Sequence, residues 1–146
     1  MTERSLQQLL NQLNSSDLSQ RHKAIFELGQ LGNLQATEAL IQSMQNSGLK
    51  ETCLLLVALT EIAVRSLKPH QRSLTAAITA EDTGIRQSAI SELTYLYEKV
   101  TEIIKHVESV ADNHSEDKEV RKTATWALAQ LNRIRRTRTQ EEPDGD

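Results

Sequence analysis

Four histidines and one cysteine are the side chains of this chain best suited to metal binding or nucleophilic chemistry. His22, His70, His106 and His114 include no pair four residues apart, the spacing typical of two zinc ligands on one helix. Cys53 lies in an apolar run, a setting that disfavours the reactive thiolate, and no GxSxG motif is present. We therefore expect no metal, no cofactor and no enzymatic activity.

The charge pattern does not favour a nucleic-acid partner. The net charge is −3 at pH 7, from 17 Lys and Arg against 20 Asp and Glu. Four arginines within 133–138 could contact phosphate, but four acidic residues within 141–146 balance them. No apolar run reaches the ~18 residues of a membrane span, and the N-terminus lacks a signal-peptide core. We expect a cytoplasmic protein that does not enter the membrane.

These residues are set within a repeated pattern, which occurs in four stretches of the chain. They read DLSQRHKAIFELGQL, NSGLKETCLLLVALT, DTGIRQSAISELTYL and DKEVRKTATWALAQL. The aligned positions are Asp17, Asn46, Asp82 and Asp117; Arg21, Lys50, Arg86 and Arg121; Ala24, Cys53, Ala89 and Ala124; and Leu28, Val57, Leu93 and Leu128. The small-residue positions lie 29, 36 and 35 residues apart, a period typical of stacked helical repeats.

Each repeat position has a physical role. An Asp before a helix can cap its unpaired N–H groups. The basic residue four positions later can reach back to that carboxylate, or to the equivalent Asp of the next repeat. The small residue allows close helix packing, and the Leu positions form a buried stripe. Asp17, Arg21, Asp82 and Arg86, with Asp117 and Arg121, are therefore predicted to be structural.

The pattern resembles the HEAT-like repeats of the phycobilisome-lyase type, D-x-x-x-[VI]-R-x-x-A-x-x-A-L-x-x-L. The stretches 85–96 and 120–131 carry it most clearly, and 26–44 adds a Gly-bounded turn and a second helix. The resemblance covers about 16–132. It implies an all-α fold, a short right-handed α-α superhelix of about four repeats.

The expected elements follow from this register. An N-terminal capping helix spans 3–13, and the repeats span about 17–46, 47–81, 82–116 and, in part, 117–132. The helix pairs are 18–31 with 35–45, 49–66 with 69–80, and 83–97 with 100–113, followed by a single helix over 118–133. We expect the charged tail, 133–146, to be disordered.

In the resembled family the second helices of the pairs form a concave face. The resemblance implies a non-catalytic adaptor or scaffold that binds a protein partner there. The predicted partner-binding residues are Glu38, Gln42, Gln45, His70, Arg72, Ser73, Glu102, Lys105, His106 and, as an aromatic anchor, Trp126. The apolar helix around Leu54–Leu59 could also support a homodimer.

The resemblance also implies an alternative function. Related repeat proteins attach bilins to phycobiliproteins, detach them, or assist phycobilisome turnover. On this hypothesis the chain would bind a phycobiliprotein or a bilin as a lyase subunit or turnover factor. Arg72, Arg86 and Tyr97 are then the candidates to hold a tetrapyrrole.

Overall fold

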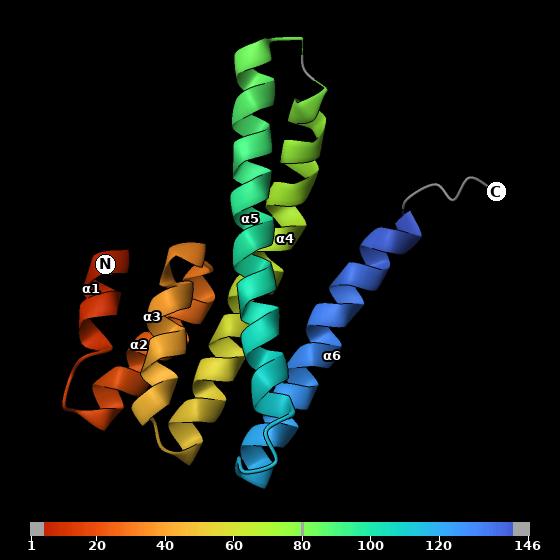
Figure 1. Ribbon diagram of the computed structural model, residues 1–146. Helices are drawn as coiled ribbons and strands as arrows, with labels where there is room; N and C mark the ends of the chain where they lie inside the picture. The colour runs from red at the N-terminus through yellow and green to blue at the C-terminus, as the bar shows by residue number, and fades with distance from the viewer. Residues whose placement is uncertain (1–4, 80, 142–146) are drawn as a thin grey trace.

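The protein is built from α-helices joined by short turns (Figure 1). The computed structural model describes residues 5–79 and 81–141, with the side chains of 68–76, 78 and 134–141 excepted. Its elements are α1 (Leu6–Gln12), α2 (Leu18–Leu31), η1 (Leu34–Ala36), α3 (Thr37–Ser43), η2 (Met44–Asn46), α4 (Leu49–Ile78), α5 (Thr83–Ala111) and α6 (Lys118–Glu141). The described residues contain no strand, so the all-α prediction is confirmed.

The first unit forms as the sequence predicts. Helix α2 has the expected bounds and ends at Gly32, whose φ of 67° is the left-handed conformation that glycine adopts without strain. The Gly32 N–H donates to the Leu28 carbonyl at 3.2 Å. The second helix of the unit, predicted over 35–45, forms as the run η1, α3 and η2.

Helices α2 and α4 lie side by side and run in the same direction. Arg21 near the start of α2 pairs with Glu51 near the start of α4. Further along, the Ser66 hydroxyl of α4 donates to the carbonyl of Gly32 at the end of α2, at 3.1 Å. Because both contacts advance together along the chain, the two helices are parallel.

Helix α6 flanks α4 on its other side, again in parallel. The Thr123 hydroxyl lies 3.4 Å from the Cys53 sulfur, and one turn further Trp126 and Val57 line the same cavity. A row of three parallel helices therefore forms, with α4 in the centre. Helix α3 and the C-terminal half of α5 pack against α4 from one side of this row (Figure 1).

The predicted homodimer surface lies on the central helix, α4. Leu55 and Leu59 are fully buried, and Leu54 is half-buried. A helix enclosed by neighbours on several sides can be apolar over most of its surface. The proposed homodimer surface at Leu54–Leu59 is therefore wrong for Leu55 and Leu59.

The predicted helix breaks in the second and third units are wrong. Helix α4 runs without a break through Pro69, and α5 runs through Glu98. A proline removes one backbone donor and kinks a helix, but surrounding contacts can sustain the helix through it. Near Glu98 no Gly or Pro interrupts the chain, and one buried stripe joins the two halves: Leu96, Val100, Ile103 and Val107.

The consequence is a helical hairpin at the start of the predicted third repeat. The C-terminal half of α4 and the N-terminal half of α5 extend together beyond α1–α3 (Figure 1). Ile90 is 52% exposed there, whereas Ile25, at the equivalent repeat position in α2, is 1% exposed. The stretch from Asp82 thus carries the repeat pattern without joining the row, and the row contains α2, α4 and α6. The superhelical geometry stays a prediction.

The C-terminal segment also differs from its prediction. Helix α6 continues past residue 133 to Glu141, where a disordered tail was expected. Arg, Gln and Glu dominate this segment, and these residues favour helix even without packing. The side chains of the cluster beyond Arg133, and residues 142–146, lie outside the described part of the chain.

Candidate functional site

The repeat aspartates cap the helices that follow them. A side-chain oxygen of Asp17 accepts the Ser19 N–H at 2.9 Å. The Asp82 side chain accepts the Ile85 N–H at 3.2 Å, and the Asp117 side chain accepts that of Glu119 at 2.8 Å. Each bond satisfies a helix donor that would otherwise lack a partner. These residues fix where α2, α5 and α6 begin.

Arg21 does not pair with Asp17 or with Asn46, the two partners that its spacing suggested. Its Nε and Nη2 donate to the two carboxylate oxygens of Glu51 at 3.2 and 3.1 Å. Its Nη1 donates to the Ser15 carbonyl at 3.0 Å. The bond to Glu51 raises the pKa of Arg21, against the lowering effect of burial. The forked pair joins α2 to the start of α4.

The other two repeat arginines reach back to the turns before their helices. Arg86 donates from Nη1 to the Glu81 carbonyl at 2.8 Å and from Nη2 to the Thr83 hydroxyl at 3.1 Å. Arg121 Nη2 lies 3.2 Å from His114 Nδ1. These contacts give the arginines a shared structural role, which is to hold the chain that enters the helix.

The α3–α5 face contains most of the surface that the sequence predicted for a partner. His106 Nε2 lies 3.0 Å from the Met44 sulfur, so α5 and η2 meet there. Burial lowers the pKa of His106. The predicted residues carried by α3, η2 and the C-terminal half of α5 are Glu38, Gln42, Gln45, Glu102, Lys105 and His106, and all except the half-buried Glu102 and His106 are exposed. We call the surface of these elements the α3–α5 face.

The other four predicted residues lie on helices α4 and α6. His70, Arg72 and Ser73 belong to the C-terminal half of α4, and their side chains lie outside the described ones. Trp126 belongs to α6 and lines a cavity with Val57 of α4. That these four residues form one site with the α3–α5 face stays a prediction.

A different apolar surface crosses the outer side of the helix row. Trp126 is 45% exposed and lines a cavity of about 410 Å³ with Val57, Lys122 and Thr123. Phe26, at the same repeat position in α2, is 57% exposed. We call Phe26, Leu54, Val57 and Trp126 the outer strip.

The packing of α4 places its strip residues between the two aromatic residues. Trp126 of α6 lines a cavity with Val57, and α2, which carries Phe26, approaches α4 closely at Gly29 and Ala58. Leu54 and Val57 are three residues apart and both half-buried, so they share the stripe of α4 that faces away from its fully buried one. The strip thus has an aliphatic floor on α4 and an aromatic residue on each flanking helix. The matching repeat positions of Phe26 and Trp126 indicated it, but the role of Val57 required the packing of α6 against α4.

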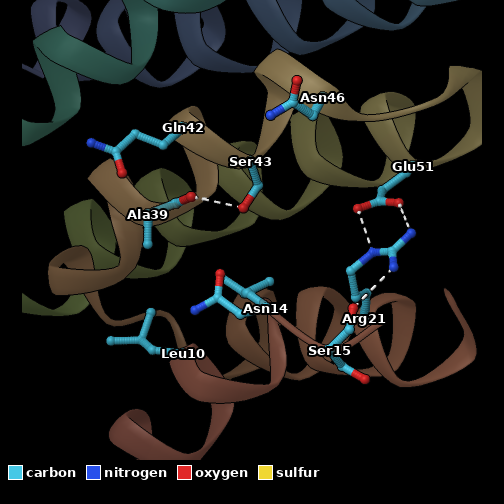
Figure 2. A pocket seen from close by; sticks show the side chains of 10 residues that line it. Leu10, Asn14, Ser15, Arg21, Ala39, Gln42, Ser43, Asn46 and Glu51 are labelled. Atoms are coloured by element: carbon cyan, nitrogen blue, oxygen red, sulfur yellow. Dashed lines mark hydrogen bonds and ion pairs between the residues drawn. The ribbon is translucent and has the colours of Figure 1, made fainter. Parts of the chain in front are cut away.

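A second cavity, of about 520 Å³, lies among the ends of α1 and α3 and the starts of α2 and α4 (Figure 2). We call it the amide pocket because three carboxamides line it. Its lining is Leu10, Leu13, Asn14, Ser15, Arg21, Ala39, Gln42, Ser43, Asn46 and Glu51. Figure 2 shows Asn14 on one wall, Gln42, Ser43 and Asn46 on the other, and the Arg21–Glu51 pair at one end.

Comparison with known proteins identifies one repeat. Residues 20–46, from α2 to η2, match the family model of the PBS lyase HEAT-like repeat, which confirms the resemblance there. No curated protein sequence matches the chain. Within the described residues there is no group of three or more His, Cys, Asp or Glu placed to hold a metal ion. None of the helices described is both long and apolar enough to cross a membrane.

Proposed function

We propose that this protein is a non-catalytic interaction module that docks a protein partner on the outer strip. The observation that carries the proposal is the exposure of Phe26 and Trp126 on both sides of the half-buried residues Leu54 and Val57. Tryptophan is enriched among the residues that dominate binding energy at protein interfaces, especially where it borders a pocket. The matched HEAT-like repeat agrees with a role in protein interaction.

The shape and charge of the strip favour one kind of partner. Neighbouring helix axes lie about 8–10 Å apart, so the strip bridges a width that suits a single helix laid against α4. Lys50 and Lys122 are exposed on α4 and α6, each within about one turn of a strip residue. The partner segment would be an amphipathic helix with apolar anchors and acidic residues beside them.

The α3–α5 face is the alternative docking surface for the same function. It is polar and of mixed charge, with Glu38 and Lys105 exposed on its two helices. Polar rims contribute less binding energy than buried aromatic anchors. We therefore place the partner on the outer strip and use the α3–α5 face as the comparison.

The test is affinity capture from the native host with three versions of the protein. The strip variant carries Phe26→Ser and Trp126→Ser, and the matched control carries Glu38→Arg and Lys105→Glu. Each pair changes two exposed or largely exposed side chains, so circular dichroism should show retained helix in both. We expect a stoichiometric partner that the strip variant loses and the control keeps. Loss in the control alone would reject the strip.

A phycobilisome-related role is the second candidate, favoured by the name of the matched repeat. A bilin would need a cationic group for its carboxylates. Arg86 is held by Glu81 and Thr83, and Tyr97 is half-buried, so the fit of these candidates is partial. Visible absorbance in the captured material, or a phycobiliprotein as the partner, would favour this candidate.

A further inference from the structure

We propose that the amide pocket binds the main chain of an extended peptide segment, with an aliphatic side chain against its apolar wall. This goes beyond docking on the outer strip, because the pocket lies at the α1–α3 end of the molecule and shares no residue with the strip. The inference rests on the proposed function only in that both ligands are proteins.

The pocket presents hydrogen-bonding groups that the fold does not use. Within the described residues, the side-chain amides of Asn14, Gln42 and Asn46 make no hydrogen bond to the protein. Each carboxamide offers two donors and an acceptor, the same groups that a peptide unit offers in return. Three such groups around one cavity can pair with consecutive N–H and C=O groups of an extended chain.

The charges within the pocket cancel. Among the described residues of the lining, Arg21 and Glu51 are the only ionisable ones, and they bind each other through two hydrogen bonds. Glu51 is buried, so a competing anion would have to displace a carboxylate that is already paired in place. A phosphate, a nucleotide or a metal cation is therefore disfavoured, and a neutral polar ligand is favoured.

The apolar lining residues select among neutral ligands. Leu10 and Leu13 at the end of α1 and Ala39 of α3 provide aliphatic surface on the two sides of the cavity, and the described lining contains no aromatic ring (Figure 2). A sugar lacks the aliphatic side chain that such a surface would bury, whereas an aliphatic peptide residue supplies it. The volume of about 520 Å³ lies within the range of small-ligand sites and suits a few residues of chain.

The test is a titration followed by the side-chain amide signals in ¹H–¹⁵N spectra. The probe is N-acetyl-leucine N-methylamide, which carries two peptide units and one aliphatic side chain. The matched control ligand is N-acetyl-N-methyl-leucine N,N-dimethylamide, which keeps both carbonyls and the leucine side chain and has N-methyl groups in place of both N–H donors. Maltose serves as the sugar control. The protein variants are Asn14→Ala and Gln42→Ala, with Gln87→Ala as an exposed amide on α5, outside the pocket.

We expect saturable shifts of the Asn14, Gln42 and Asn46 signals with the first probe, at a dissociation constant on the order of millimolar. Asn14→Ala and Gln42→Ala should each weaken binding about threefold to tenfold, the effect of one neutral hydrogen bond, and Gln87→Ala should not. Absence of saturable shifts, an equal response to the dimethylamide, or a saturable response to maltose alone would overturn the proposal. None of these outcomes changes capture through the outer strip, so the two proposals fail separately.

Discussion

At the scale of single residues, the repeat positions act chiefly at the helix starts. Asp17, Asp82 and Asp117 cap their helices, a role that follows from sequence because a cap and its donor lie two or three residues apart. The partner of Arg21 was not predictable in the same way. Glu51 lies thirty residues away and occupies no repeat position that the pattern singled out.

The free energy of unfolding should depend on pH through His106. Burial against Met44 lowers its pKa in the folded protein, while the unfolded chain keeps the ordinary value near ~6.5. The neutral ring is therefore favoured by folding. Its contribution to stability is fully present above the unfolded pKa and is lost as the pH falls below that value toward the folded pKa.

The measurement is urea unfolding of wild type, His106→Gln and Lys105→Gln from pH 7.5 to pH 5. The wild type and Lys105→Gln should lose more free energy of unfolding on acidification than His106→Gln. Lys105 is exposed beside His106 and serves as the control position. Equal losses in all three proteins would contradict burial of a neutral His106.

At the scale of helices, the bounds of α2 could be predicted from sequence, whereas the lengths of α4 and α5 depend on packing. The bounds of α2 followed from an Asp cap and a left-handed glycine, both local signals. The lengths of α4 and α5 did not, because Lys68–Pro69 resembles a helix start and the repeat period suggested a break near Glu98 that no local signal marks. One buried apolar stripe runs along both halves of α5 and keeps them in a single helix. Which residues are buried in this way depends on tertiary contacts.

The close approach of α2 and α4 depends on Gly29. A Cβ at this position would lie 3.2 Å from the Ala58 Cα and 3.3 Å from its Cβ. Gly29→Val should therefore lower the free energy of unfolding by about 1–3 kcal/mol through overpacking. Gln30→Val, at the exposed neighbouring position of α2, should stay within about 0.5 kcal/mol. A neutral Gly29→Val would mean that the helices pack differently.

The substitution Pro69→Ala tests whether α4 is one continuous helix. In an uninterrupted helix, Pro69→Ala restores a backbone donor, a gain of up to about 3 kcal/mol. The loss of proline's restraint on the unfolded chain offsets about 1 kcal/mol of this. We expect a net rise of roughly 1–2 kcal/mol in the free energy of unfolding. Gln71→Ala controls for helix propensity and should change little. A decrease for Pro69→Ala would indicate that the residue begins a separate helix.

At the scale of the whole molecule, the same repeat pattern produces two different environments. The all-α class and the presence of an N-terminal helix, α1, followed from sequence, since periodicity and caps are local. The capping role of α1 stays a prediction. Ile25 and Ile90 occupy equivalent repeat positions, yet one lies in the core and the other on the projecting hairpin. Which stretch joins the row depends on how α4 and α5 pair, and a repeat pattern does not encode that pairing.

The outer strip shows the same limit for the candidate site. Phe26 and Trp126 were related by repeat position, but the predicted site combined Trp126 with residues of α3, η2, α4 and α5. The structure instead sets Trp126 beside Val57 of α4. The strip became visible only once α2, α4 and α6 were known to lie in one row.

The central claim is that a protein partner docks on this strip, and photo-crosslinking tests it most directly. A benzoyl-phenylalanine at Lys122, which lines the Trp126 cavity, is compared with one at Ser109, which is exposed on α5. Both proteins are irradiated in native host lysate. The account predicts one discrete crosslinked protein from position 122 that disappears when Phe26→Ser and Trp126→Ser are added. Crosslinking from position 109 alone would contradict it and place the partner on the α3–α5 side.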